Sequence, residues 1–448
     1  MSWLFLIVSV VGFLFTLNAF LPTSNRVLLV PSFFASWFTI ELAGHHLVWQ
    51  ALATIFFVYE GALESWPGWL GLTLTFLSWV GLWVLIVRGR KAAVTMRAAM
   101  EEAVSTDHDS APRVPRRHVL VPFLFRRPES RVVRNVVYRK VGGRTLKLDV
   151  YLPRGGPEST AKMRPAIMQI HGGAWVIGDK REQGIPLLGH LAANGWVGFN
   201  VNYRLSPSAT FPDHLVDLKA ALVWIREHAD EYGIDPDFIA VTGGSAGGHL
   251  TALMGLTAND PEYQPGFEQA DTSVQAAVPF YGVYDFTDRL ATQTKGFLNL
   301  FIEPYVMKAY LADEPEKFAK ASPIDRVRAD APPFFIIHGD RDTLAPLADA
   351  RLFVERLRAV STQPVVYAEL RGAQHAFDIF VSPRTAPVIE GVERFLDGVR
   401  EDWLRGLEGG GEGAVTDATL VVEADGGVAE GLVDEGLVGK RSPAAKSA

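Results

Sequence analysis

The five residues Gly243-Gly244-Ser245-Ala246-Gly247 constrain the fold of this chain more than any other segment. They follow an apolar run, Phe238 to Thr242, that is typical of a buried strand, and they precede a helix-like run, His249 to Leu256. A Gly-x-Ser-x-Gly pattern between a strand and a helix predicts a sharp turn that lifts the serine hydroxyl out of the sheet. Both outer positions require glycine, because a side chain there would collide with the neighbouring strand or helix.

A second glycine-rich segment, His171-Gly172-Gly173-Ala174-Trp175, ends the apolar run Pro165 to Ile170. Glycines let the backbone approach a substrate closely, and N–H groups held there can stabilise a developing oxyanion. The amide of Ala246 is a further candidate donor, because the first amides of a helix have no partner within the helix. A Gly-Gly pair after a strand can also be an ordinary turn. The presence of the serine turn downstream favours the functional interpretation.

Candidate acids and a candidate base follow two more apolar strands. Asp340 and Asp342 come after Phe334 to Gly339, and His375 lies in a loop after Val365 to Leu370. In the order Ser, Asp, His, such residues can form a triad in which the histidine takes the serine proton and the aspartate orients the histidine. Either aspartate could do this, although a carboxylate in a turn often only accepts bonds from local N–H groups.

These motifs, together with Asn202-Tyr203-Arg204-Leu205-Ser206-Pro207 and Gly372-Ala373-Gln374-His375, resemble the carboxylesterase and hormone-sensitive-lipase-like α/β-hydrolases. The His-Gly-Gly-x-Trp form is also similar to the arylformamidase and feruloyl-esterase-related branch, and Ala174 stands where a third glycine is usual. The resemblance covers about Val132 to Trp403. It implies the catalytic residues Ser245, Asp342 and His375, with Asp342 preferred over Asp340 because family members place the acid third after the strand-end glycine. It further implies oxyanion donors at Gly173, Ala174 and Ala246, supported by His171, Gly172, Gly243 and Gly247.

The same region alternates strand-like and helix-like runs, which predicts an α/β fold with a doubly wound, mostly parallel sheet. Gly142-Gly143 predicts a hairpin between Val132–Lys140 and Thr145–Leu152. The stretch of about 285–333 is too long for a simple connection, and its aromatic residues suggest a helical cap insertion. An ordinary packed insertion is the alternative.

The N-terminal region is predicted to hold transmembrane helices. Trp3–Leu21 and Gly68–Val87 are each long and apolar enough to cross a bilayer, and Val27–Leu63 could form one long span or two short ones. Three or four spans are therefore expected, and the basic residues after the last span predict a cytoplasmic catalytic domain in a multi-pass protein of the cell membrane. Glu41 and His45, four residues apart within this region, could bind a metal, but an interface position is favoured.

Four parts are expected along the chain: a transmembrane module (1–90), a basic amphipathic linker (91–131), the catalytic domain (132–404) and a disordered acidic, glycine-rich tail (405–448). The arginines and apolar residues of the linker fit either a lipid headgroup layer or docking on the catalytic domain. A chain lacking residues 1–97 is expected to hydrolyse soluble esters still.

The favoured function is a membrane-anchored serine carboxylesterase or lipase-like hydrolase that cleaves acyl esters through an acyl-enzyme. It would need no cofactor or metal, would act on a small-molecule or lipid-derived ester, would contact membrane lipids and would not bind nucleic acid. A formamidase-type amidase is the alternative enzyme, because the same triad cleaves both bond types. A third interpretation is a catalytically inactive interaction module. The complete set of motifs argues against it. Oligomeric state cannot be predicted from these residues.

Overall fold

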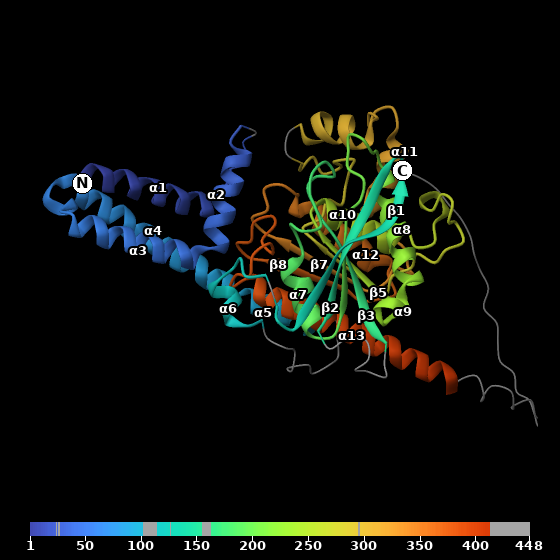
Figure 1. Cartoon of the computed structure of the whole chain (residues 1–448). Coiled ribbons are helices and arrows are strands. Elements are labelled where there is room, and N and C mark those ends of the chain that lie inside the picture. Colours follow the sequence, from blue (N-terminus) through green and yellow to red (C-terminus); the bar gives the residue numbers. More distant parts are fainter. Residues whose placement is uncertain are drawn as a thin grey trace, which may run out of the picture. The chain divides into compact units, whose positions relative to one another are not determined.

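The computed structural model describes residues 1–412 except 24, 26, 102–113, 126, 155–162 and 294–295, and for 408–412 the backbone only. Its α/β domain is built on an eight-stranded sheet with the order β1-β2-β4-β3-β5-β6-β7-β8 (Figure 1). β1 (Ser130–Val141) and β2 (Arg144–Pro153) form the predicted antiparallel hairpin, and β2 pairs antiparallel with β4. The remaining pairs are parallel, as predicted, and are formed by β3 (Arg164–Ile170), β4 (Val197–Val201), β5 (Ile234–Gly244), β6 (Ala276–Phe280), β7 (Phe334–Gly339) and β8 (Val365–Leu370).

Helices cover both faces of the sheet, which makes the fold doubly wound. Successive side chains of a strand point to opposite faces, and β7 shows the result. The Phe334 ring meets Phe353 of α12 (Leu347–Val360), whereas the Phe335 ring meets Phe395 of α13 (Thr385–Glu412). The helices of the domain are α7 (Ile185–Ala193), α8 (Asp213–Glu227), α9 (Ala229–Tyr232), α10 (Ala246–Leu256), α11 (Pro315–Ala321), α12 (Leu347–Val360) and α13 (Thr385–Glu412).

The described N-terminal region, up to residue 90, contains four α-helices. They are α1 (Ser2–Phe20), α2 (Leu29–Glu41), α3 (Ala43–Tyr59) and α4 (Trp66–Arg90), with a short 3-10 turn, η1 (Ala62–Glu64), before α4. Ser2–Phe20 and the continuous helix Trp66–Glu101 are long and apolar enough to cross a membrane. The pair α2 and α3 would add a third span if it counts as one, but it is bent by 88°. The composition of the described helices therefore allows two or three spans.

The contact between α1 and α4 has the character of helices that pack in lipid. Its residues are small, so that the helix backbones come close together; a Cβ at Gly71 would lie 3.2 Å from the Leu6 Cα. The hydroxyl of Thr75 donates to Ser9 at 3.0 Å, and those of Thr16 and Ser78 lie 2.7 Å apart. Small residues and interhelical hydroxyl bonds are the usual means of association when the surroundings are as apolar as the side chains.

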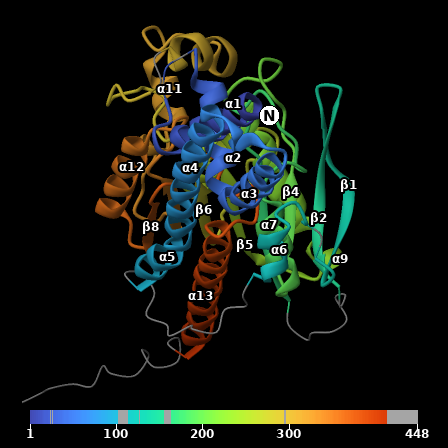
Figure 2. The ribbon, with the colours of Figure 1, turned by 90° about the vertical axis from the view of Figure 1, so that its left-hand side faces the viewer.

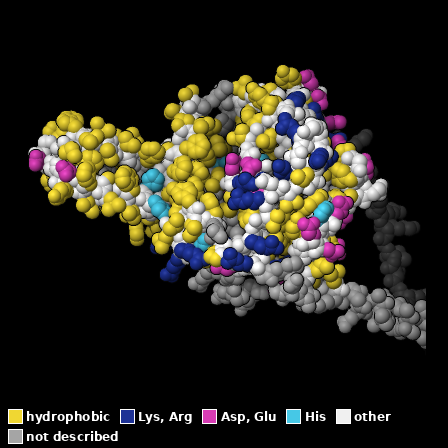
Figure 3. All heavy atoms as spheres, in the orientation of Figure 1, with side chains coloured by type: hydrophobic (Ala, Val, Ile, Leu, Met, Phe, Trp, Pro, Cys, Tyr) yellow, Lys and Arg dark blue, Asp and Glu magenta, His cyan; other side chains and the backbone are white. Residues whose placement is uncertain are grey.

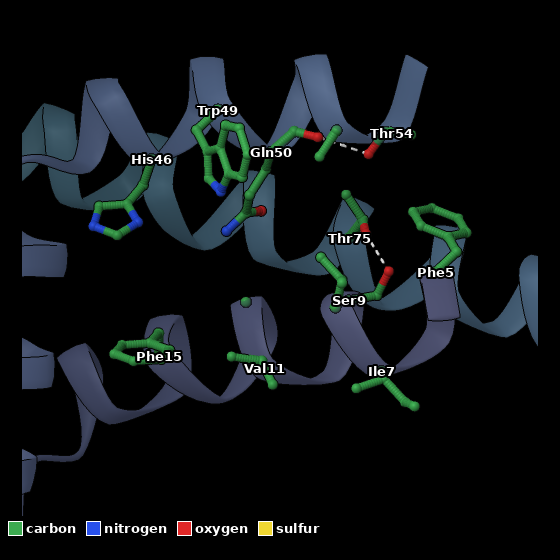
Figure 4. Close-up of a pocket in the computed structure, with 13 residues that line it drawn as sticks. Phe5, Ile7, Ser9, Val11, Phe15, His46, Trp49, Gln50, Thr54 and Thr75 are labelled. Atoms are coloured by element: carbon green, nitrogen blue, oxygen red, sulfur yellow. Dashed lines mark hydrogen bonds between the residues drawn. The ribbon is translucent and has the colours of Figure 1, made fainter. Parts of the chain in front are cut away.

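The outer surface of these helices is apolar (Figure 3), and it includes the large exposed side chains Leu14, Trp49, Ile55 and Phe76. A continuous apolar surface of this kind is rare on soluble proteins. Between α1 and α3 lies a groove of about 300 Å³, into which Gln50 points from α3 toward α1 (Figure 4). The Gln50 Oε1 atom is buried there without a hydrogen-bond partner among the described residues.

The segments that join these parts are partly described. α5 (Ala92–Glu101) continues α4 onto the α/β domain, where Met96 packs against Gly391. The linker helix α6 (Arg116–Leu120) lies beside α7 of the domain (Figure 2). Its residue Leu120 is exposed, whereas Phe123 packs edge-on against Phe380. The linker thus docks on the domain and still presents apolar side chains to the outside.

The expected cap contains the π-helix η4 (Leu298–Met307), followed by α11 and the short η5 (Pro323–Asp325). The rings of Phe297, Phe301 and Tyr305 form a row with spacings of 5.5 and 5.9 Å. At the other end of the chain, helix α13 extends to Glu412, so residues 405–412 of the expected tail are helical. Residues 413–448 lie outside the described part, and the expectation of a disordered tail concerns them.

Candidate active site

The predicted turn around Ser245 is present at the end of β5. Ser245 has φ 60° and ψ −122°, a conformation that L-residues rarely adopt. Its N–H group donates to the Phe280 carbonyl at 3.0 Å, which fixes the turn against β6. The glycine requirement is steric, because a Cβ at Gly243 would lie 2.5 Å from the Ile170 oxygen and one at Gly247 only 2.1 Å from the same atom. The turn therefore presses directly on the end of β3.

The glycine-rich segment after β3 lies beside this serine. A Cβ at Gly172 would come within 3.0 Å of the Ser245 Cβ. Gly173, Ala174 and Trp175 all have positive φ (108°, 51° and 62°), so the backbone here turns sharply. Among the described residues, no protein acceptor takes the N–H groups of Gly173, Ala174 or Ala246. Three free amide donors thus lie on the two segments that meet at Ser245.

Trp175 anchors this segment to the helix that follows the serine. Its indole Nε1–H donates to His249 Nδ1 at 3.2 Å, and His249 Nε2 donates to the Ala321 carbonyl at 2.7 Å. The Trp175 ring also meets Phe286 edge-on. These contacts link the segment after β3 to α10 and to α11 of the expected cap. His249 was not predicted as a site residue, although it lies only four positions after Ser245.

His171 supports the same segment from below. Burial lowers its pKa to about 4, so the ring is neutral near pH 7. It stacks on the Tyr203 ring at 4.5 Å, and the Tyr203 hydroxyl donates to the His171 carbonyl at 2.9 Å. His171 and Tyr203 therefore help to fix the backbone conformation of the glycine-rich segment after β3.

Asp342 and His375 come together at the ends of β7 and β8. His375 Nδ1 lies 2.7 Å from Asp342 Oδ2, and the other carboxylate oxygen accepts the N–H groups of Leu344 and Ala345, each at 2.8 Å. Burial alone would raise the pKa of the Asp342 carboxyl, but His375 and His338 outweigh it and hold the pKa well below its usual range. An ionised carboxylate in this position fixes the histidine proton on Nδ1 and leaves Nε2 free to accept one.

The other aspartate has a different partner. Asp340 Oδ1 accepts the N–H group of Gly372 at 2.6 Å and so ties the loop after β7 to the loop after β8. Of the two candidates, the structure places Asp342 against His375. No hydrogen bond within 3.5 Å joins the Ser245 hydroxyl to His375, both of which are described. Catalytic hydrogen bonds without substrate are often long and shorten in the complex.

Two residues around His375 were not singled out by sequence reasoning. The Tyr281 ring lies 4.6 Å from the His375 ring, and its hydroxyl donates to the half-buried Asp378. Gln374 is fully buried, and its Oε1 atom accepts the N–H groups of Thr343 and His375, each at 2.9 Å. Gln374 stands in the motif Gly-Ala-Gln-His, so its position beside the histidine was the available signal.

Glu41 and His45, the candidate metal ligands of the N-terminal helices, have separate partners. Glu41 forms a buried ion pair with Arg384 (Nε to Oε1, 2.9 Å) and accepts the Ser382 hydroxyl at 2.6 Å. His45 Nε2 lies 2.9 Å from the Leu120 carbonyl. Both contacts are with other segments of the protein, as the interface interpretation of these residues expects.

Ser245, the Gly172–Ala174 segment, Asp342 and His375 all lie at the carboxyl ends of parallel strands, which is where open α/β sheets bind ligands. This combination of sheet, strand–serine–helix turn and acid–base pair defines an α/β-hydrolase. Comparisons with known proteins agree. Residues 148–357 match the BD-FAE family. The chain is 44% identical over 337 residues to a probable carboxylic ester hydrolase, LipM, of Mycobacterium tuberculosis, covering 71% of this chain and 75% of LipM.

The chain therefore belongs to the BD-FAE family of α/β-hydrolases and is a carboxylic ester hydrolase. It is also 46% identical to esterase LipQ of M. tuberculosis over 57% of this chain, and it spans 60% of the length of LipQ. Among solved structures, the butyrate-bound esterase Est2 of Thermogutta terrifontis superimposes with a TM-score of 0.50 at 27% identity. That match covers 61% of this chain and 94% of Est2. The predicted enzyme class and fold are thus confirmed.

Proposed function

We propose that the chain is a membrane-anchored serine esterase in which Ser245, His375 and Asp342 form the catalytic triad. The observation that carries the proposal is the pair of His375 and ionised Asp342 after β8 and β7. The strained Ser245 turn and three unused amides follow β5 and β3, at the same edge of the sheet. Each part has a role that ester hydrolysis requires, and the fold brings all of them to one edge of the sheet.

In this mechanism the Ser245 oxygen attacks the ester carbonyl carbon while its proton passes to His375 Nε2. The carbonyl oxygen becomes an oxyanion, which the N–H groups of Gly173, Ala174 and Ala246 stabilise. The tetrahedral intermediate collapses, the bond to the alcohol oxygen breaks, and His375 returns the proton to the leaving alcohol. Water then attacks the acyl-enzyme with His375 as the base, and the carboxylic acid leaves. Asp342 keeps its charge throughout and stabilises the imidazolium.

A fluorophosphonate probe tests the nucleophile, because it forms a covalent bond only with an activated serine. The wild type and Ser208→Ala, which changes an exposed serine in another loop, should both be labelled and active. Ser245→Ala should lose labelling and hydrolysis of a short acyl ester and keep its melting temperature. Labelling that persists in Ser245→Ala would refute the assignment.

The membrane part of the proposal rests on the N-terminal helices. α1 and α4 are long and apolar enough to span, and α3, with 17 residues, is at the short end of the spanning range. Aromatic side chains gather at one end of these helices, where Trp3 and Trp66 pack edge-on and Tyr59 is exposed. Basic residues, Arg88 and Arg90, lie in the last turn of α4 at the other end. Trp and Tyr favour membrane interfaces, and Lys and Arg favour the cytoplasmic side.

Three spans, α1, α3 and α4, would place the α/β domain in the cytoplasm, beside the inner leaflet. Membrane-derived or amphiphilic esters are then the natural class of substrate. Alkaline carbonate washing should leave the full chain in the membrane fraction. Protease should digest the α/β domain in inverted vesicles and not in intact cells, and the reverse pattern would overturn the topology.

A further inference from the structure

One face of helix α2 contacts the loop that carries His375. Phe33, Ser36 and Trp37 lie three and four positions apart and so project from the same side of the helix. All three reach residues 374–376: Phe33 meets the His375 ring edge-on at 6.4 Å, and the other two form hydrogen bonds. Other side chains of α2, including Val30 and Phe34, are exposed.

The Ser36 contact acts through Gln374. The Gln374 Nε2 group donates to the Ser36 hydroxyl at 3.1 Å, and this hydroxyl donates in turn to the Phe33 carbonyl at 2.9 Å. Because Nε2 is fixed by Ser36, Oε1 faces the N–H groups of Thr343 and His375. One buried carboxamide thus joins the backbone next to Asp342 to the backbone of His375, and α2 sets its orientation.

The Trp37 contact acts on the residue after the histidine. The indole Nε1–H group donates to the Ala376 carbonyl at 2.8 Å, and Ala376 has φ 60°, which is unfavourable for a residue with a Cβ. The Trp37 ring also stacks on Phe380 at 4.8 Å. A backbone held in an unfavourable conformation needs support from its surroundings, and Trp37 supplies a hydrogen bond at this position.

The end of α2 is fixed to the same part of the domain. Glu41 pairs with Arg384, and the Arg384 guanidinium also donates to the carbonyls of Arg371 and Gly372, at 2.8 and 3.0 Å. Both side chains of the pair are almost completely buried. Breaking a buried ion pair by removing one partner is strongly destabilising. The Glu41–Arg384 pair therefore fixes the position of α2 beside the loop after β8.

We propose that Ser36 and Trp37 are positioning residues for catalysis, which hold His375 in line with Ser245 and Asp342. This inference rests on the proposed role of His375 as the base. Small displacements of a catalytic group, on the order of 1 Å, can lower a rate about 100-fold. The N-terminal helices then contribute to turnover directly, in addition to any role as an anchor.

The test uses the full-length chain in detergent or liposomes and a short soluble ester. Ser36→Ala and Trp37→Phe each remove one hydrogen bond between α2 and the loop after β8, and leave most of the packing. Both should lower kcat about 10-fold or more with little change in KM, and both should slow fluorophosphonate labelling of Ser245 by a similar factor. Ser36→Thr, which keeps the hydroxyl, should restore most of kcat.

Two matched controls separate positioning from general damage to the helices. Trp69→Phe removes the same kind of bond, from Nε1 to the Leu63 carbonyl (3.0 Å), at the start of α4. Thr39→Val removes a buried hydroxyl of α2 that bonds only within its own helix, to Ala35 at 2.7 Å. Both controls should keep kcat within about twofold.

Wild-type kcat in Ser36→Ala and Trp37→Phe would overturn the inference, and so would equal losses in the two controls. His375→Gln is measured alongside. If His375→Gln is inactive while the two α2 variants are normal, only the positioning role fails. If His375→Gln retains full activity, the triad itself is wrong and the positioning role falls with it.

Discussion

The clearest prediction concerns the choice between Asp342 and Asp340. Asp342→Asn keeps the volume of the side chain and removes its charge. The asparagine oxygen can still accept the N–H groups of Leu344 and Ala345, so its NH₂ group will face His375 Nδ1. Two donors then oppose each other at 2.7 Å unless His375 moves its proton to Nε2. In that tautomer His375 can no longer accept the serine proton.

The expected loss follows from this change of tautomer. In a serine protease the equivalent substitution lowers kcat about 10⁴-fold with little change in geometry, which corresponds to about 5.5 kcal/mol of activation free energy. Asp340→Asn is the matched control, since Asp340 accepts one bond, from the Gly372 N–H group, and its asparagine oxygen can do the same. We expect less than about a tenfold loss there.

The assay is kcat/KM for a short soluble ester, with the melting temperature of each variant measured in parallel. Asp342→Asn should melt near the wild type, because its oxygen keeps the hydrogen bonds from the Leu344 and Ala345 N–H groups. The reasoning would be refuted if Asp340→Asn were the crippled variant, or if Asp342→Asn kept a tenth or more of the wild-type activity.

Three further outcomes are expected. Gly247→Ala should lower stability by about 1–3 kcal/mol or more, because its Cβ would lie 2.1 Å from the Ile170 oxygen, whereas Gly44→Ala, with no atom within 4 Å, should be neutral in a thermal melt. Burial lowers the pKa of His214 to about 4, so between about pH 6.5 and 4 the unfolded chain binds a proton that the folded chain does not. The free energy of unfolding therefore falls as the pH drops through this range. Urea titrations at pH 7.5 and 5.5 should show that this fall is about 1 kcal/mol smaller in His214→Asn. Deleting residues 1–97 should reduce kcat at least 100-fold, since the chain loses Ser36, Trp37 and the partner of buried Arg384, and a fully active truncated enzyme would contradict the contacts of α2.

The sheet and the candidate site could be predicted because their signals are local. The strand–Gly-x-Ser-x-Gly–helix pattern is contiguous, and the turn it forms depends mainly on the two outer glycines. Similarly, the strands from β3 to β8 each contain a short apolar run, and Gly142-Gly143 marks the hairpin of β1 and β2. Choosing Asp342 over Asp340 needed the resemblance to a family, because the carboxylates are two residues apart and both end up in hydrogen bonds.

The role of α2 could not be predicted from the same sequence. Its apolar residues suit a lipid environment as well as a protein interface, so the sequence predicts spans whose removal leaves an enzyme that still hydrolyses soluble esters. Its partners lie far along the chain: Ser36 and Gln374 are 338 positions apart, and Trp37 and Ala376 are 339 apart. Periodicity reveals that a helix has an apolar face, but only the folded chain shows what that face contacts.

If α3 crosses a bilayer and α2 positions His375, as proposed above, the sharp bend at Leu42 connects the bilayer mechanically to the reaction. α2 ends at Glu41 and α3 begins at Ala43, at 88° to each other, so a single residue separates a helix seated beside His375 from one suited to cross the membrane. Helices whose apolar length does not match the bilayer respond by tilting. A tilt of α3 would be transmitted through Leu42 to α2 and would displace it. The rate of hydrolysis would then depend on bilayer thickness. Turnover measured in liposomes of graded acyl-chain length would then describe this enzyme better than turnover in any one detergent.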